Sequence, residues 1–197
     1  LAMYREADIN CYLGGTLFEA FAVRGMFDDY RRLLDELKLE YAEVSDGCIH
    51  IPEEEKLGYI ETLAKQVTVL SEVGSKTDAD LLSEEDWIRK MKAELEAGAW
   101  KVIAEARESD SFGIFDAHGN AKTHMIGHIS EQIGNDNVLW EAPQKAQQVW
   151  FINEFGANVN LGNIAPHEVV PLETLRIGLR GDTFFNFLPK EIADKMR

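Results

Sequence analysis

Residues 67–76 read VTVLSEVGSK, a short β-branched run that ends in a carboxylate and then a lysine. Valine and threonine favour strands, and an apolar run of this length is typical of a buried one. Two later runs repeat the design, VIAE at residues 102–105 and VLWE at residues 138–141. The sequence therefore predicts three strands that each deliver a glutamate at the same end.

Strand patterns alternate with helix patterns along the whole chain. In the predicted helices, apolar residues recur every three or four positions, which is the spacing of one buried helix face. About six strand–helix units of roughly thirty residues each indicate a parallel sheet with helices packed outside it. The predicted strands cover residues 9–13, 41–45, 67–72, 101–104, 138–141 and 159–161.

Two parallel architectures fit this alternation. An open doubly wound sheet would carry a dinucleotide fingerprint, but Gly14-Gly15-Thr16 has neither the spacing nor the acidic residue that should follow. A closed eight-unit barrel takes about 250 residues, roughly two units more than this chain provides. We therefore predict a (β/α)8 TIM barrel without its first two strand–helix units, as a single domain over residues 1–197 with a C-terminal tail at residues 184–197.

The composition describes a globular chain and excludes several kinds of partner. Of 197 residues, 45% are hydrophobic, and 20 basic against 35 acidic residues give a net charge of -15. The negative electrostatic field that results from this charge repels nucleic acid and anionic membranes, although a local cluster of cations can still hold a small anion. No apolar run spans a bilayer and no signal peptide is apparent, so the expected location is cytoplasmic. The oligomeric state stays open, because the apolar tail either docks on the domain or joins a homo-oligomer contact.

Two further sets of side chains are predicted to bind no metal. Cys11 and Cys48 lack the spacing of metal ligands and are expected to be reduced thiols. His124 and His128 lie four residues apart on a predicted helix, a spacing that can bind Zn2+, but the glutamate of the metalloprotease motif is missing. We expect both histidines to be exposed and to ligate nothing.

The carboxyl ends of all strands meet at one rim of such a barrel, where the chemistry gathers. Carboxylates are the ligands that hard divalent cations prefer, so Glu72, Glu105 and Glu141 are candidate metal ligands. The alternative for each of them is a solvated or salt-bridged rim residue. The same rim is predicted to carry Thr16, Glu19, Glu43, Ser45, Asp46, Lys76, Arg107, Glu108, Gln144, Lys145, Asn160 and Asn163.

Motifs along nearly the whole chain, up to about Phe185, resemble those of the phosphosulfolactate synthase family. Their number and their order make the resemblance specific. They are GGTLFE at 14–19, VSDG at 44–47, LSEVGSK at 70–76, AGA at 97–99, EARES at 105–109, EAPQK at 141–145, NVNLGNI at 158–164, LETLR at 172–176 and GLRGDT at 178–183.

The resemblance implies a (β/α)8 barrel that adds sulfite to phosphoenolpyruvate with Mg2+, giving (2R)-phosphosulfolactate on the route to coenzyme M or to sulfolactate. It also implies that Lys76 is the general acid, whereas the residues alone leave a loop salt bridge open. Family members begin with two further strand–helix units, including a basic strand end without a counterpart here. The activity of this chain on its own is thereby left open.

Basic side chains are the candidates for holding the anionic substrates, because a guanidinium fork matches a tetrahedral oxyanion. Arg180 has an alternative role as a helix C-terminal cap. A second class of function is a catalytically inactive relative that acts through protein contacts, as plant heat-stress proteins resembling this family do. The intact glutamates and Lys76 favour the enzyme. The candidate substrate-binding residues are Arg107, Arg176, Arg180, Asn160, Gln144 and Lys145.

Overall fold

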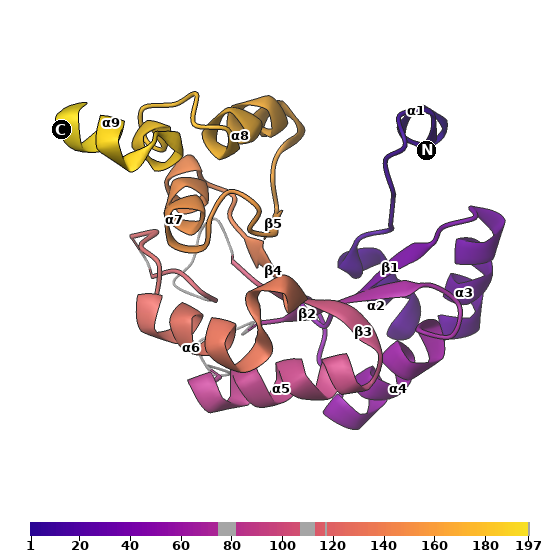
Figure 1. Ribbon diagram of the computed structural model, residues 1–197. Coiled ribbons are helices and arrows are strands. Elements are labelled where there is room, and N and C mark those ends of the chain that lie inside the picture. The colour runs from indigo at the N-terminus through magenta and orange to yellow at the C-terminus, as the bar shows by residue number, and fades with distance from the viewer. Residues whose placement is uncertain (75–81, 107–112, 117, 197) are drawn as a thin grey trace.

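The computed structural model describes residues 1–74, 82–106, 113–116 and 118–196. These residues form an α/β fold on a parallel five-stranded sheet with the order β1-β2-β3-β4-β5 (Figure 1). Each strand pairs with the next one along the chain. Sequential order without a reversal is the pattern of a barrel and not of a doubly wound sheet, so the fold is consistent with a partial TIM barrel. The strands are β1 (Tyr41–Val44), β2 (Thr68–Val73), β3 (Ala99–Ala104), β4 (Val138–Glu141) and β5 (Leu161–Gly162).

Helices connect the strands and line the outer side of the sheet. Figure 1 shows the chain as an arc, with α3, α4, α5 and α6 outside it and the two chain ends at opposite sides. The α-helices of the described residues are α1 (Ala2–Glu6), α2 (Gly15–Ala22), α3 (Phe27–Glu36), α4 (Glu53–Leu63), α5 (Glu84–Glu96), α6 (Thr123–Ile133), α7 (Lys145–Phe155), α8 (Val169–Arg176) and α9 (Lys190–Met196). Short 3-10 helices lie at Asn135–Asn137, Pro166–Glu168 and Phe184–Phe187.

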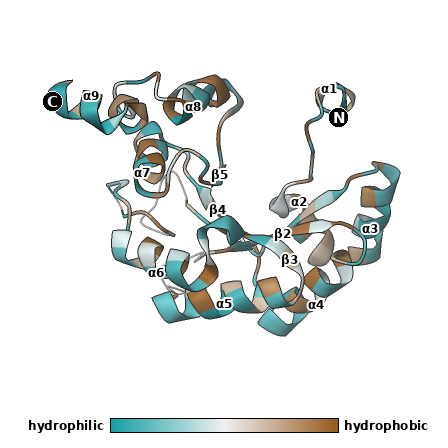
Figure 2. Cartoon of the chain, viewed as in Figure 1, coloured by the Kyte–Doolittle hydropathy of each residue, from teal (hydrophilic) through white to brown (hydrophobic). Residues whose placement is uncertain are grey.

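The hydrophobic core lies between the sheet and these helices. Successive strand residues point to opposite faces, and Val102, Val138 and Trp140 are fully buried on the helix side. Trp140 stacks on Phe151 of α7 with ring centroids 5.3 Å apart. The outer helices accordingly carry both hydrophobic and hydrophilic stretches, as Figure 2 shows. The opposite face of the sheet carries both apolar side chains, such as Ile103, and acids, such as Glu72.

Local capping sets several helix ends. Ser83 caps the start of α5, where its Oγ accepts a hydrogen bond from the Asp86 amide at 3.1 Å. Gly98 lies just past the end of α5 with φ of 111°, a conformation that favours glycine. Helix α7 begins at Lys145, because Gln144 forms a capping box with the third helical residue.

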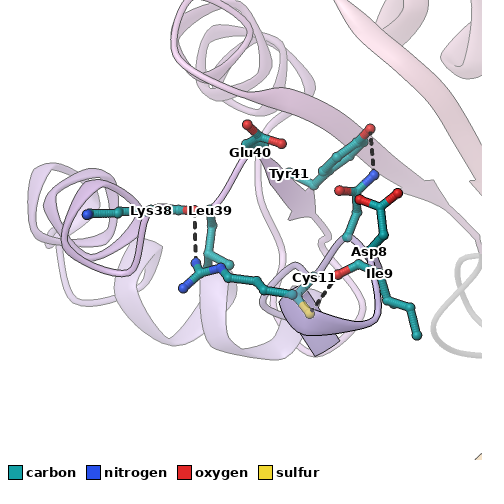
Figure 3. Close-up of a pocket in the computed structure, with 9 residues that line it drawn as sticks. Asp8, Ile9, Cys11, Lys38, Leu39, Glu40 and Tyr41 are labelled. Carbon is teal, nitrogen blue, oxygen red and sulfur yellow. Dashed lines mark hydrogen bonds between the residues drawn. The ribbon is translucent and has the colours of Figure 1, made fainter. Parts of the chain in front are cut away.

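The predicted strand at residues 9–13 is wrong, since this segment forms no ladder with β1 and is irregular. Side chains hold it in place: Asn10 Nδ2 donates to Tyr41 Oη at 3.3 Å, and Arg5 donates to the carbonyl of Lys38 at 3.0 Å. A cavity of about 260 Å3 separates the segment from the residues that precede β1 (Figure 3). Apolar composition permits a strand, but only a backbone partner makes one. The described sheet therefore has five strands where six were predicted.

Two smaller predictions have clear outcomes. Cys11 and Cys48 are free thiols, as expected. The last predicted strand, residues 159–161, is observed at Leu161–Gly162. Within the described parts of the chain, no helix is both long enough and apolar enough to cross a membrane.

Candidate active site at the carboxyl end of the sheet

The strand register places acids on the inner face of the sheet. Glu72 of β2 pairs with Ile103 of β3, and Ile103 pairs with Leu139 of β4. Side chains two positions apart in a strand point to the same face. Glu105 and Glu141 come two residues after Ile103 and Leu139, so they lie on the face that carries Glu72. The structure thus brings these three glutamates to one face and one end of the sheet.

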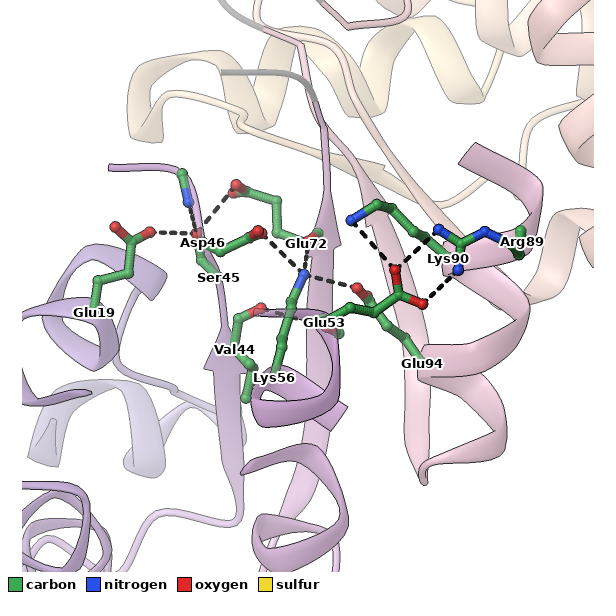
Figure 4. A network of polar contacts seen from close by, with 12 residues as sticks. Glu19, Val44, Ser45, Asp46, Glu53, Lys56, Glu72, Arg89, Lys90 and Glu94 are labelled. Carbon is green, nitrogen blue, oxygen red and sulfur yellow. Dashed lines mark hydrogen bonds and ion pairs between the residues drawn. The ribbon is translucent and has the colours of Figure 1, made fainter. Parts of the chain in front are cut away.

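Ser45 joins two carboxylates at this end. It follows β1 directly and, when the β1–β2 register is continued, lies level with Glu72. Ser45 Oγ lies 2.6 Å from Glu19 Oε1 and 3.1 Å from Glu72 Oε1 (Figure 4). The amide of Gly47 donates to Ser45 Oγ at 3.0 Å, and the amide of Cys48 donates to Glu19 Oε2 at 2.6 Å. These contacts fix the loop after β1 against both α2 and β2.

The other glutamates are packed against the backbone of neighbouring strands. Gly74 lies opposite Glu105, and a Cβ at Gly74 would collide with the Glu105 carboxylate. Glycine at this strand end therefore makes room for the acid of the next strand. Glu141 Oε2 accepts a hydrogen bond from the Ala106 amide at 2.7 Å, and Glu43 Oε1 accepts one from the Gly15 amide at 2.8 Å.

A cavity of about 740 Å3 opens above these groups. Its walls come from the start of α2, the loop after β1 and the ends of β2 and β3. Among the described residues, the lining includes acids but no lysine or arginine. The lining residues are Gly14, Gly15, Thr16, Leu17, Glu19, Glu43, Ser45, Gly47, Cys48, Glu72 and Glu105.

Burial and mutual repulsion make these carboxyls hard to ionise. Burial raises the pKa of Glu72 to about 8, with further contributions from the charges of Glu105, Glu141 and Glu43. Burial also raises the pKa of Glu141 to about 7, with contributions from Glu105 and Glu43. The pKa of Glu43 is raised chiefly by burial. Acids that repel each other in this way are stabilised by a cation placed among them.

The donor set fits a hard divalent cation in its chemistry. Carboxylate oxygens of Glu43, Glu72 and Glu105 from successive strand ends face one cavity. Burial, together with the charges of neighbouring acids, raises the pKa of Glu72 there and that of Glu141 nearby. Within the described ranges, no three acid, histidine or cysteine side chains are grouped so that they could hold a metal ion by themselves. Mg2+ does not require such a group, because it keeps several waters and is usually held by one or two carboxylates together with substrate oxygens.

Without divalent cations, we expect thermal stability to fall as pH rises from about 5 to about 8. A pKa above the ordinary value of 4.5 means that the folded protein binds the proton more tightly than the unfolded chain does. Ionisation of Glu72 and Glu141 therefore costs stability, beginning near pH 4.5 and ending above the folded-state pKa of about 8. The measurement is Tm across this range in EDTA.

Mg2+ should raise Tm more at high pH than at low pH, and Glu72→Gln should flatten the pH dependence in EDTA. A control substitution at the exposed Glu61, Glu61→Gln, should leave the pH dependence as in the wild type. If neither Mg2+ nor Glu72→Gln changed the pH dependence of Tm, Glu72 would not be a ligand of a cation at this site.

The structure places two predicted substrate-binding residues at the amino end of the sheet. Arg176 donates to the carbonyl of Val159 at 2.9 Å and also to that of Ala157, both of which precede β5. Asn160 Nδ2 donates to the carbonyl of Val138, the first residue of β4, at 3.2 Å. These contacts hold the chain before β5, and neither side chain lines the cavity.

The remaining predicted residues are distributed differently. Gln144 caps α7, and Lys145 forms an exposed ion pair with Asp182 at 2.7 Å. Arg180 Nε donates to Thr174 Oγ1 at 3.0 Å. Lys76 and Arg107, the predicted general acid and a predicted anion ligand, lie outside the described residues.

Sequence reasoning put Glu19, Glu43 and Ser45 on the rim but assigned them no role. Glu19 is 2% exposed although it lies on α2, and its partner Ser45 is 3% exposed. Of these three residues, only Glu43 could have been assigned to the site from sequence, because it lies near the carboxyl end of a strand like the other three glutamates. Glu19 had no such signal, since its place depends on how α2 packs against the loop after β1.

His124 and His128 lie away from this site. His124 Nδ1 lies 3.1 Å from Glu84 Oε2 and His128 Nδ1 lies 3.5 Å from the same oxygen. The His124 side chain is 88% exposed. The predicted exposure of His124 is therefore confirmed, whereas His128 is only partly exposed. The two histidines link α6 to the start of α5.

The family model described as (2R)-phospho-3-sulfolactate synthase (ComA) matches residues 1–182. Three proteins that carry the name phosphosulfolactate synthase resemble the chain along most of its length. The protein of Methanothermobacter thermautotrophicus is 45% identical over 185 residues, which is 92% of this chain and 72% of that protein. The protein of Bacillus subtilis is 41% identical over 189 residues, 94% of this chain and 75% of that protein. The protein of Methanocaldococcus jannaschii is 44% identical over 185 residues, 92% of this chain and 74% of that protein.

Proposed function

Because this chain belongs to the (2R)-phospho-3-sulfolactate synthase family, we propose that it is a lyase that adds sulfite to phosphoenolpyruvate. The predicted family is confirmed, and with it the predicted class of enzyme. The observation that carries the proposal is the meeting of Glu72 and Glu105 in one cavity at the carboxyl end of a parallel sheet. Active sites of barrel enzymes gather at this end. The five strands in sequential order further support a sheet that belongs to an eight-stranded barrel.

Glu72, Glu105 and Glu141 are the residues that would hold Mg2+. When bound, the cation would supply Lewis-acid stabilisation of negative charge on the substrate carboxylate. The repulsion that raises the pKa values of Glu72 and Glu141 supports this role, because a cation removes it. Their strand-end positions give the ligands rigid supports, which keeps the charge preorganised.

The reaction is an addition in which nothing leaves. The sulfur of sulfite forms a bond to the methylene carbon of phosphoenolpyruvate, and the electrons of the carbon–carbon double bond shift toward the carboxylate. The adjacent carbon then takes a proton and becomes the chiral centre of (2R)-phospho-3-sulfolactate. Lys76 is proposed to supply this proton, and a pKa lowered toward the working pH would make it a better acid.

Both substrates are anions, and the described lining of the cavity is acidic as well, so the lining alone would repel them. Cations must therefore come from the bound metal and from basic side chains beside it. Arg107 and Lys76 are each the third residue after the end of a strand, β3 and β2 respectively, and are proposed for this task. The substrate-binding roles of Arg176, Arg180, Asn160, Gln144 and Lys145 stay predictions, as does the cytoplasmic location.

The test of the function is a coupled disappearance of both substrates. The purified protein with Mg2+ is incubated with phosphoenolpyruvate and sulfite, and the phosphate ester is followed by 31P NMR. We expect a new phosphate-ester signal only when all three additions are present, and its loss in excess EDTA. Unchanged phosphoenolpyruvate in the complete mixture would overturn the proposal and favour a relative that acts through protein contacts.

A further inference from the structure

A buried ion-pair network lies directly behind the rim of the candidate site. Lys56 of α4 and Glu94 of α5 are each 4% exposed. Lys56 Nζ lies 2.7 Å from Glu94 Oε1 and 3.1 Å from Asp46 Oδ1, and it donates to the backbone carbonyl of Glu72 at 2.5 Å (Figure 4). An ammonium group has three donors, and here each finds one acceptor.

The three acceptors come from three separate elements. Asp46 belongs to the loop after β1, the Glu72 carbonyl to β2, and Glu94 to α5. Burial opposes the positive charge, but Glu94 and Asp46 outweigh it and hold the pKa of Lys56 above its ordinary value. The positively charged Lys56 therefore connects the loop after β1 and the end of β2 with helix α5.

Two of these acceptors adjoin the groups that face the cavity. Asp46 follows Ser45 in the chain, and the Glu72 carbonyl belongs to the residue whose carboxylate meets Ser45 at 3.1 Å. Fixing Asp46 and the Glu72 backbone therefore fixes the distance between Ser45 and Glu72. Lys90 of α5 provides a contrast, because its side chain is 25% exposed and its ammonium lies 3.8 Å from Glu53 at the start of α4 (Figure 4).

A purely structural role for Lys56 would be the neutralisation of Glu94. A buried acid without a cation is strongly destabilising, but that task needs only the Glu94 contact. The contacts with Asp46 and with the Glu72 carbonyl are extra to it and point toward the site. The two roles therefore separate when both Lys56 and Glu94 lose their charge.

We propose that Lys56 is a positioning residue of the site, which holds the loop after β1 and the end of β2 so that Ser45 and Glu72 meet at the cavity. The role in turnover rests on the proposed function. The positioning itself does not, because it can be measured on the backbone of the protein without substrates.

The decisive variant is the double substitution Lys56→Met with Glu94→Gln. Lys56→Met alone leaves Glu94 buried without its cation and should be destabilised, whereas the double variant should recover much of its Tm. We expect kcat of the double variant to remain about 10- to 100-fold below that of the wild type. This is the usual effect of removing a residue that holds the groups lining a site. KM should change far less than kcat. Glu94→Gln alone retains the contacts of Lys56 with Asp46 and with the Glu72 carbonyl, so its kcat should stay near wild type although its Tm should fall. The control Lys90→Met should also keep a kcat near wild type.

Hydrogen–deuterium exchange gives a readout that needs no activity. The amides of Gly47 and Cys48 donate to Ser45 and Glu19, and we expect them to exchange faster in the double variant but not in Glu94→Gln. If the wild type shows no turnover, the proposed function fails while exchange still decides the role of Lys56. Wild-type exchange at Gly47 and Cys48 in the double variant would overturn the positioning role. Equal acceleration in Glu94→Gln and Lys56→Met would also overturn it and leave neutralisation of Glu94 as the role of Lys56.

Discussion

Replacement of Glu72 by glutamine is expected to lower kcat by about 10²- to 10³-fold, the effect of removing one preorganised electrostatic group. Glutamine keeps the shape of Glu72 and can still contact Ser45, 3.1 Å away. It cannot carry the negative charge that a cation needs. The loss should therefore appear in turnover and in Mg2+ affinity together, measured by initial rates and by titration calorimetry.

The matched control is Glu61→Gln on the exposed side of α4, which makes the same chemical change away from the cavity. It should leave kcat and Mg2+ affinity within about twofold of wild type, because surface changes of this kind shift energies by about 0.5 kcal/mol or less. If Glu72→Gln bound Mg2+ and turned over like Glu61→Gln, Glu72 would have no part in metal binding.

Replacement of Lys76 by alanine is expected to lower kcat by about 10²- to 10⁴-fold, the contribution typical of a general acid. Lys76 lies outside the described residues, so this expectation rests on the family and on its place after β2. The sulfur–carbon bond can still form, but the carbon next to the carboxylate lacks its proton donor. Binding of phosphoenolpyruvate in Mg2+, measured by calorimetry, should change much less than kcat.

Lys76→Arg separates proton donation from charge. Arginine keeps the positive charge, but a pKa above about 12 prevents it from releasing a proton at neutral pH. We expect Lys76→Arg to bind phosphoenolpyruvate like the wild type and to turn over as slowly as Lys76→Ala. Recovery of kcat in Lys76→Arg would show that the charge, and not the proton, is what the reaction requires.

Much of the fold could be predicted because its signals are local. The apolar runs at residues 67–72, 101–104 and 138–141 each became a strand, with ends within about two residues of those expected. Ser83 caps the start of α5 with its hydroxyl, and Gly98 follows its end in a backbone conformation that favours glycine. The segment at residues 9–13 failed because its apolar residues indicate a strand only if a neighbour accepts its backbone hydrogen bonds.

The candidate site was predictable only in part. Parallel strands deliver their carboxyl ends to one rim, so the convergence of Glu72, Glu105 and Glu141 followed from where each strand stops. Asn160 was placed on the rim by the same reasoning, whereas Arg176 was proposed because a guanidinium matches an oxyanion. The observed partners of both are backbone carbonyls at the amino end of the sheet. Asn160 directly precedes the two-residue strand β5, so a shift of one or two residues in the predicted strand moves its side chain from one end of the sheet to the other. Arg176 lies at the end of helix α8, and its partners depend on how that helix packs.

The sequence alone determined the family, the parallel α/β architecture and the end of the sheet that carries the acids, because each depends on residues close together in the chain. Only the tertiary structure decided that Ser45 bridges Glu19 and Glu72, that Gly74 makes room for Glu105, and that Lys56 holds the rim from behind. Those contacts join residues far apart in sequence. They depend on strand register and on the packing of α2, α4 and α5, which a local pattern of residue types does not encode.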